Sequence, residues 1–278
     1  MRVLVTGAAG PVGASIHERL SRDHEVVGLD LRDSPHTAIR GSITDAALLR
    51  RALAGIDAVV HVASLHAPHV GLRRDAEFEQ VNVVATEALL ALAQDAGVSH
   101  WVYTSTTALY GVTGAPPAGA AAWIDEDTPP QPRTVYHRTK LAAESKVEAA
   151  ARGGAFCATI LRISRCFPEP PAAMALQRLH RGIDLRDVAE AHARALATAA
   201  PGCRRFVVSH PTPFERADAE ELLLDAPAVL RRRAPALVAA FAQRGWPLPR
   251  SIDRVYDSRR AVAELGWMPR HDFHDLLA

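Results

Sequence analysis

Cysteine, net charge and long apolar runs are all scarce in this sequence of 278 residues. Its three cysteines, Cys157, Cys166 and Cys203, are odd in number and far apart, so neither a disulfide framework nor a paired-cysteine metal site is expected. A reducing, cytoplasmic compartment fits such a chain. The formal net charge of +1 gives no electrostatic reason to expect a nucleic acid or an acidic membrane as a partner.

The lack of long apolar runs argues against a membrane-spanning helix and against a secretory signal. No stretch approaches the roughly eighteen apolar residues of a membrane-spanning helix, and the apolar run before Gly7 is too short for a secretory signal. What is present is an alternation of short apolar segments and helical patterns. We expect strands at 2–6, 24–30, 57–63, 100–105, 157–163 and 204–209, and helices at 11–22, 44–55, 75–96, 134–151 and 185–199. Near-continuous Val, Leu and Ile strands between helices predict an α/β fold, a doubly wound parallel sheet covered on both faces.

Two segments interrupt this alternation. Residues 111–133 are rich in Gly, Ala and Pro and are predicted to form a surface loop, and 215–245 are predicted to form short helices. The basic run at 231–233 is interpreted as a solvated face. We therefore expect one large domain over 1–165 and 183–209, and a small C-terminal substrate lobe over 166–182 and 210–278.

Three glycines stand where the first strand meets the first helix, in "TGAAGPVG". Gly7 permits a tight turn, Gly10 lets the backbone approach a pyrophosphate, and Gly13 lets the helix pack close to the sheet. The N–H groups at a helix N-terminus favour an anion there. Pro11 suits the first helical position but supplies no N–H, so the N–H groups of Val12 and Gly13 gain importance. The pattern predicts a Rossmann-type dinucleotide site.

Asp30 strengthens this prediction. It ends the second strand, seventeen residues after Gly13, where a carboxylate can accept hydrogen bonds from an adenosine ribose. The same carboxylate would repel a 2′-phosphate, so NAD is expected in preference to NADP. Leu31 and Arg32 follow it, and the Arg32 cation could soften that preference.

Tyr136 and Lys140 are four residues apart in a predicted helix, so they share a face. An ammonium beside a phenol favours the phenolate and lowers the pKa of the tyrosine, which makes it usable as a general base near neutral pH. Upstream, "YTSTTALYG" places Ser105, Thr106 and Thr107 just after a strand. Ligands of open parallel sheets bind at that edge.

Together these motifs resemble the extended short-chain dehydrogenase/reductase family, also called the NAD-dependent epimerase/dehydratase family. The matching features occur in the family's order and span nearly the whole chain: "TGAAGPVG", Asp30, "VVHVAS" (59–64), "VNVVAT" (81–86), "YTSTTALYG" (103–111), "YHRTK" (136–140), "LRISRCFPEP" (161–170) and "ELGWMP" (264–269).

The resemblance implies a role for each matching residue. Tyr136 would be the acid/base, Lys140 would hold the nicotinamide ribose, and Thr106 would hydrogen-bond the reacting oxygen, with Ser105 as the alternative. Asn82 would support the active site. The remaining residues expected to line the cofactor are Ser42, Ile43, Val62, Ala63, Ser64, Thr104, Ile163 and Ser164.

Two departures bear on the ligands. Ser42 stands where the family often has a carboxylate before the adenine-contacting hydrophobic residue, here Ile43, so adenine affinity is expected to differ. The short form with "PEP" resembles uronate dehydrogenases, but Met174 occupies the position of their carboxylate-binding arginine. A thioether cannot pair with a carboxylate. A uronate is therefore in doubt, and the short lobe favours a small substrate over a nucleotide sugar.

Further candidates follow the strands on the ligand side. His66 and His69 could contact substrate, form a metal pair or be plain loop residues; further metal ligands are not evident, so no metal is expected. His61 is interpreted as structural. Cys166 lies by the expected pocket, where a buried thiol without activation is the simpler reading.

The sequence thus predicts an NAD-dependent oxidoreductase acting on a sugar-like or polyol molecule, the substrate class being implied by the resemblance alone. Two alternatives stay open: a sugar epimerase that retains its NAD, and a regulatory protein that binds NAD(P) without turnover. Dehydration is disfavoured because Thr107 and Ala108 replace the family's Asp–Glu. By resemblance, helices 75–96 and 134–151 would form a homodimer interface.

Overall fold

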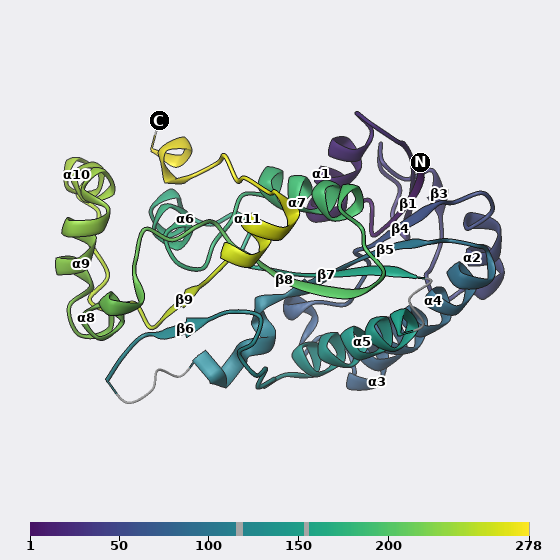
Figure 1. Ribbon diagram of the computed structural model, residues 1–278, viewed down its shortest axis with the longest axis horizontal. Coiled ribbons are helices and arrows are strands. Elements are labelled where there is room, and N and C mark those ends of the chain that lie inside the picture. The colour runs from purple at the N-terminus through teal and green to yellow at the C-terminus, as the bar shows by residue number, and fades with distance from the viewer. Residues whose placement is uncertain (115–118, 153–155, 278) are drawn as a thin grey trace.

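The computed structural model describes residues 1–114, 119–152 and 156–277. Its main feature is a parallel sheet of seven strands in the order β3-β2-β1-β4-β5-β7-β8 (Figure 1). These strands are β1 (Arg2–Thr6), β2 (Glu25–Asp30), β3 (Ile39–Arg40), β4 (Ala58–His61), β5 (His100–Thr106), β7 (Cys157–Ile163) and β8 (Gly202–Val208). The predicted doubly wound fold is confirmed, and β1 lies between β2 and β4, where the strand order reverses.

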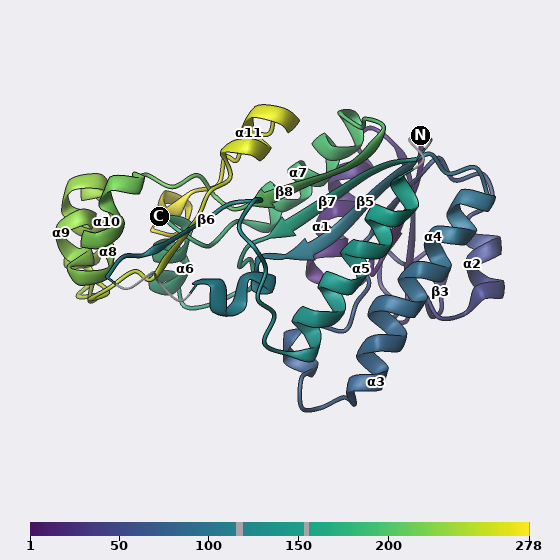
Figure 2. The same cartoon turned by 60° about the horizontal axis from the view of Figure 1, so that its bottom comes forward.

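Helices cover both faces of this sheet, as Figures 1 and 2 show from two directions. One face carries α1 (Pro11–Leu20), α7 (Leu185–Ala197) and α11 (Arg259–Leu265), and the other carries α2 (Ala46–Ala52), α4 (Ala85–Asp95) and α5 (Val135–Ala151). Alternate strand residues supply the two cores. In β1, Val3 and Val5 face α1 and α7, whereas Leu4 faces the opposite core.

Local sequence explains where several helices begin. Asp45 accepts hydrogen bonds from the N–H groups of Ala47 and Leu48 and so starts α2. Thr134 caps α5 through its hydroxyl, which accepts from His137 N. The expected helix at 75–96 divides into α3 (Asp75–Phe78), a π-helical segment (Glu79–Val84) and α4. A π turn widens the helix locally and is often found beside functional sites.

A second, smaller cluster of elements forms the lobe at one end of the sheet (Figure 1). Its helices are α6 (Pro171–Arg178), α8 (Ala219–Leu224), α9 (Ala226–Arg233) and α10 (Pro235–Gln243). They share an apolar core that includes Leu179, Leu230 and Phe241. Arg232 and Arg233 form ion pairs with Asp218, and further pairs reach Glu221 and Glu215. These two arginines of the basic run therefore face neighbouring carboxylates.

The prediction of a surface loop over 111–133 is wrong in part. Residues 122–124 form the strand β6 (Ala122–Ile124), which pairs in parallel with β9 (Arg254–Tyr256) in a separate two-stranded sheet. Ala122 and Ile124 are buried, since the alternation Ala-Trp-Ile turns both toward the interior. The partner strand lies far along the chain, so the local composition did not reveal the pairing. Residues 115–118 of this segment lie outside the described residues.

A buried ion pair joins α5 to the sheet. Arg162 of β7 donates from Nη2 to Glu144 Oε2 at 2.7 Å and from Nε to Glu144 Oε1 at 3.0 Å. Both side chains are 1% exposed. Ser105 Oγ donates to the same carboxylate at 2.5 Å, and Arg162 Nη1 donates to the Tyr110 hydroxyl at 2.9 Å. The carboxylate thus has three donors from two strands, which offsets its loss of water.

We predict that Glu144→Ala lowers the free energy of unfolding by about 3–5 kcal/mol, because it leaves the Arg162 cation buried without its partner. The control is Glu148→Ala, one turn later on α5. Glu148 is 35% exposed and pairs with the half-buried Arg205, so its loss should cost less than about 1 kcal/mol. Urea unfolding followed by circular dichroism measures both; equal losses would contradict the role given to Glu144.

Candidate active site

The glycine turn between β1 and α1 is built for close approach. Gly7 has φ +75°, and a Cβ there would lie 2.8 Å from Ala63 N. A Cβ on Gly13 would lie 2.0 Å from Gly7 O, so neither position accepts a side chain. Gly10 precedes α1 in extended conformation, and Pro11 takes the first helical position as expected. Among the described residues no side chain caps this helix, so the N–H groups of Val12 and Gly13 remain available to an anion.

Asp30 lies beside this turn. Its carboxylate accepts from Ala9 N at 3.0 Å and from Arg32 N at 2.9 Å, which fixes the end of β2 against the glycine loop. Leu31 and the Arg32 side chain are 65% and 67% exposed. The Arg32 guanidinium lies 3.7 Å from Asp30. The Asp30 carboxylate and the exposed Arg32 cation therefore lie together at the edge of the sheet where an adenosine ribose is expected.

The two residues expected near adenine are not equally accessible. Ile43 is buried in the core with Leu29 and Leu49, being 6% exposed. Ser42 is half-buried, and its hydroxyl bonds Thr44 Oγ1 at 2.7 Å. Ile43 thus packs in the core behind this edge of the sheet, while Ser42 is part of a local turn.

The end of β4 is held by a chain of buried hydrogen bonds. Thr6 Oγ1 accepts from the N–H groups of Val62 and Ala63, both at 3.2 Å, and lies 2.7 Å from His61 Nδ1. The other ring nitrogen of His61 lies 2.9 Å from Thr86 Oγ1. Burial lowers the pKa of His61 to about 3, so the ring is neutral. These contacts agree with the structural reading of His61.

Asn82 is a supporting residue with no free side-chain group facing the site. Its amide donates to Leu65 O at 2.9 Å and to Thr139 Oγ1 at 3.1 Å, and its carbonyl accepts from Leu65 N at 2.7 Å. The side chain is 1% exposed. It ties the loop after β4 to the helix that carries Tyr136. The sequence predicts that Asn82 supports the active site. Its side-chain amide and carbonyl are bonded to Leu65 and Thr139 and do not point to a cofactor.

Lys140 is buried and specifically placed. Its Nζ donates to Thr104 O at 2.7 Å and lies 4.0 Å from the centre of the Tyr103 ring. Burial lowers the pKa of Lys140 to about 7, while the nearby Glu144 carboxylate opposes that shift. The side-chain hydroxyl of the same residue, Thr104 Oγ1, is hydrogen-bonded to His192 Nε2 at 2.8 Å. The chain contains only one further lysine, Lys146.

The expectation that Tyr136 has a lowered pKa is wrong for this structure. Burial raises the pKa of Tyr136 to about 12, and a hydrogen bond with Thr106 lowers it only partly. Lys140 does not counter the burial, because its ammonium is directed to Thr104 O. Tyr136 is therefore a protonated phenol here, in contact with the Thr106 hydroxyl.

Thr106 and Ser105, the two candidates for the hydroxyl that would hold the reacting oxygen, have different partners. Ser105 is 2% exposed and its hydroxyl donates to Glu144. Thr106 is half-buried, its hydroxyl accepts from Ala108 N at 3.1 Å, and it lies close enough to Tyr136 to lower the pKa of the phenol. Consecutive strand residues point to opposite faces of a sheet, so only one of the two can face the tyrosine. Thr106 is that residue.

The loop after β7 completes the site. Ile163 ends the strand, and the Ser164 hydroxyl is buried with no hydrogen-bond partner among the described residues. His66, from the loop after β4, stacks on Phe167 with ring centres 6.2 Å apart, and its Nδ1 is also buried without a partner there. His69 Nδ1 accepts from His66 N at 3.0 Å. In the described part of the chain, no cluster of three His, Cys, Asp or Glu residues could hold a metal.

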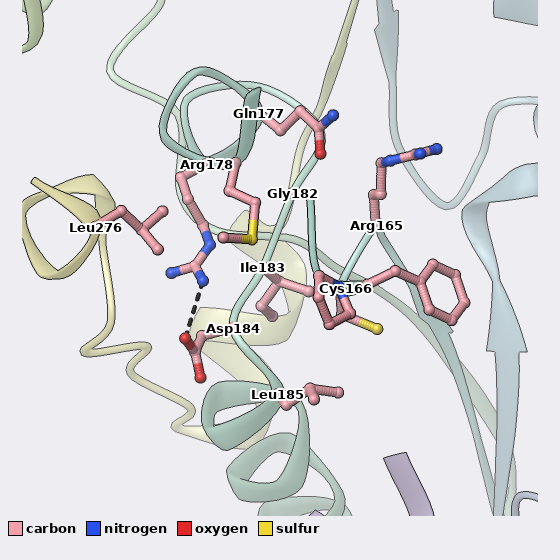
Figure 3. A pocket seen from close by; sticks show the side chains of 12 residues that line it. Arg165, Cys166, Gln177, Arg178, Gly182, Ile183, Asp184, Leu185 and Leu276 are labelled. Carbon is pink, nitrogen blue, oxygen red and sulfur yellow. Dashed lines mark hydrogen bonds and ion pairs between the residues drawn. The ribbon is translucent and has the colours of Figure 1, made fainter. Parts of the chain in front are cut away.

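A cavity of about 220 Å³ lies between this loop and the lobe (Figure 3). It contains two of the predicted substrate residues, Cys166 and Met174. Burial raises the pKa of the Cys166 thiol to about 12, so it stays protonated. The other lining residues come from the same loop, from α6, from the start of α7 and from the C-terminal segment: Arg165, Phe167, Pro168, Gln177, Arg178, Gly182, Ile183, Asp184, Leu185 and Leu276.

Sequence reasoning missed several residues that shape the site. Glu144 follows Lys140 by one helical turn, and that spacing was the available signal for a partner on the same face. Asp184 caps α7 by accepting from Arg186 N at 2.9 Å, and an Asp before an amphipathic run is a recognisable cap. The pairing of Asp184 with Arg178 had no such signal.

No helix among the described residues has both the length and the apolar character needed to span a membrane.

The sequence is similar to several named proteins over somewhat more than half of its length. It is 38% identical over 161 residues to a 3 beta-hydroxysteroid dehydrogenase/Delta 5-->4-isomerase of Mycobacterium tuberculosis, covering 53% of this chain and 42% of that protein. It is 30% identical over 173 residues to a UDP-glucose 4-epimerase of Lactobacillus helveticus, covering 58% of this chain and 51% of that protein. The matched segment thus spans about half the length of these relatives.

Solved structures share the fold over the entire chain at low identity. A short-chain dehydrogenase/reductase superfamily protein from Agrobacterium tumefaciens, with bound NAD, has a TM-score of 0.73 at 23% identity, covering 100% of this chain and 95% of that one. A mutated uronate dehydrogenase has a TM-score of 0.68 at 20% identity, covering 99% and 83%. Residues 3–174 match the NAD dependent epimerase/dehydratase family. The chain is therefore a member of the NAD-dependent epimerase/dehydratase family.

Proposed function

We propose that this protein is an NAD-dependent oxidoreductase that interconverts a secondary alcohol and a ketone in a sugar-like or polyol molecule. The observation that carries the proposal is the placement of the buried Tyr136 phenol near the Thr106 hydroxyl at the end of β5, with the buried Lys140 one helical turn away on α5. Family membership supports the use of NAD. A sugar-type substrate is supported by relatives such as the UDP-glucose 4-epimerase.

The chain's own residues fit NAD. The first N–H groups of α1 have no side-chain cap and suit a pyrophosphate, and Asp30 is placed for a ribose. The unpartnered Ser164 hydroxyl is a buried polar atom that needs a partner, and the nicotinamide carboxamide would supply one. Val62, Ala63 and Ser64 follow β4 on the same edge. When bound, NAD supplies the acceptor or donor of hydride.

In this proposal the proton chemistry belongs to Tyr136 and Thr106. The Thr106 hydroxyl holds the substrate oxygen against the Tyr136 side chain. In oxidation the phenolate form of Tyr136 accepts the hydroxyl proton, so Tyr136 must first give its own proton to solvent, and in reduction the phenol form returns a proton to the substrate. A phenol with a pKa of about 12 is a poor base at pH 7. The Lys140 ammonium is a cation that could lower this pKa, because Lys140 lies one turn along the same helix face. Reorientation of Lys140 from Thr104 O toward a bound ribose would bring its charge closer to Tyr136.

An epimerase that retains NAD is the second candidate, since it needs the same residues and returns the hydride within one active site. A regulatory protein without turnover is the third. The burial of both Tyr136 and Lys140 favours an enzyme over a regulatory protein. Burying an ammonium costs free energy, and a catalytic role gives a reason for that cost.

We also propose a homodimer formed by the outer faces of α4 and α5. These helices pack side by side, with Lys146 bonded to Glu87 at 2.8 Å. Val84, at the start of α4, is 44% exposed and would be covered in such an assembly.

Tyr136→Phe should reduce turnover at least a thousandfold, because the ring remains while the proton carrier is lost. NAD affinity should change less than threefold. NADH formation at 340 nm with a panel of sugars and polyols, and calorimetric titration with NAD, measure the two quantities. Thr106→Val should also lose activity and Thr106→Ser should regain it. Wild-type rates in Tyr136→Phe would remove Tyr136 from the mechanism.

Lys140 should lose its proton near pH 7 in the NAD-free protein, far below an ordinary lysine. NMR of protein carrying isotope-labelled lysine would resolve only two side-chain signals, and Lys146→Arg assigns them. Glu144→Gln should lower the pKa of Lys140 further, because the carboxylate favours the ammonium. An ordinary lysine titration at Lys140 would contradict the burial described above.

Native mass spectrometry of the freshly purified protein should give a dimer that takes up one NAD per chain and loses it on dilution. A dimer that retains NAD would favour the epimerase instead. A monomer would refute the proposed interface, and failure to bind NAD or NADP would refute the proposed function.

A further inference from the structure

The cavity beside the lobe is placed to receive the substrate of the proposed reaction, and the inference below rests on that reaction. Cys166 lines it and lies close enough to Tyr136 to influence its pKa. Phe167 also lines it and stacks on His66, whose neighbour Leu65 packs against Tyr136. The cavity therefore adjoins the tyrosine.

Most of the cavity wall is apolar. Seven of its lining residues offer carbon or sulfur surface: Cys166, Phe167, Pro168, Met174, Ile183, Leu185 and Leu276. Its volume of about 220 Å³ is below the roughly 300–1,000 Å³ of sites for drug-sized ligands. The dimensions suit one small ring better than a nucleotide sugar.

The buried cation of the cavity is already neutralised. Arg178 Nη2 donates to Asp184 Oδ2 at 2.9 Å (Figure 3). Arg178 Nη1 donates to the carbonyl of His271. The side chains of Arg178 and Asp184 are only 6% and 14% exposed. Arg186 adds a second guanidinium to the same carboxylate at 2.8 Å. Burial acts to raise the pKa of Asp184, but the bonds from Arg186 and Arg178 outweigh it and hold the pKa below its usual range.

The second arginine of the wall is paired as well. Arg165 donates from Nε to Glu169 at 2.5 Å and from Nη2 at 2.7 Å, a two-bond fork between a half-exposed pair. Each arginine that lines the cavity thus has a carboxylate partner. An incoming carboxylate or phosphate would have to displace one of these partners and would meet the Asp184 charge at the buried end.

We propose that this cavity selects a neutral, single-ring hydroxy compound, and that Asp184 excludes anionic substrates by occupying Arg178. The apolar wall contacts one face of the ring, and Gln177 offers a neutral amide to a hydroxyl. In this arrangement Asp184 is a specificity residue that acts through Arg178. A capping role for Asp184 alone would leave the discrimination between neutral and anionic ligands unaffected.

The variant Asp184→Asn separates these two roles. Asparagine still caps a helix, so α7 keeps its first-turn bond, whereas the Arg178 cation loses its counter-charge. Asp184→Ser also keeps a side chain that can cap α7 and also removes the counter-charge of Arg178. It replaces Asp184→Asn in the experiment if that variant folds poorly. The double variant Asp184→Asn with Arg178→Gln removes the released cation and should restore the wild-type preference.

Calorimetric titration of the NAD-loaded protein with D-glucose and D-glucuronate, which share a ring and differ in charge, measures the preference. Wild type should bind glucuronate at least tenfold more weakly than glucose. Asp184→Asn should raise the affinity for glucuronate at least tenfold while changing that for glucose less than threefold.

Two results would overturn the proposal: wild type binding glucuronate as tightly as glucose, or no gain of anion affinity in either Asp184 variant. If glucose does not bind detectably, the gain for glucuronate in the variants still decides. The preceding titration with NAD alone, together with NADH formation, tests the proposed function separately. A protein that binds NAD yet gains no anion affinity would fail the selectivity proposal only.

Discussion

The ion pair between Glu144 and Arg162 is the interaction on which the arrangement of the site depends. It fixes α5 against β7 in the interior. Ser105 donates to the same carboxylate, so the end of β5 is fixed as well. Tyr136 and Lys140 project from that helix, and Thr104 and Thr106 from that strand. Because a carboxylate and a guanidinium cannot be separated in a low-dielectric interior without large cost, the two elements hold one relative position. The spacing of the proposed catalytic residues therefore depends on this ion pair.

Much of the fold followed from the sequence because the relevant signals are local. The glycines of the first turn, the apolar strands and the caps at Asp45 and Thr134 each depend on neighbouring residues. The doubly wound parallel sheet and the helices that cover both of its faces are predicted on that basis, whereas the strand order comes from the structure. The predicted edge of the sheet also brings Gly7, Asp30 and Ala63 together, since parallel strands end on one side.

What the sequence did not reveal depends on contacts between distant segments or on burial. The partner of β6 lies about 130 residues further on, and Arg178 meets the carbonyl of His271 93 residues away. The direction of the Tyr136 pKa shift is of the second kind. A spacing of four residues indicates that a lysine and a tyrosine share a face, but not that the ammonium turns to a strand carbonyl. Side-chain direction in a buried site is set by the surrounding atoms.

The parallel pairing of β6 with β9 has a consequence for the order of assembly. The segment after Thr106 runs through β6, so its conformation relies on a strand that is synthesised much later. Contacts of such sequence separation form slowly and only after the intervening chain is available. On the ribosome, the seven-stranded sheet through β8 can condense first, whereas the segment beside Thr106 gains its strand partner only once Tyr256 has emerged. Maturation of the catalytic edge would then be among the last events of folding.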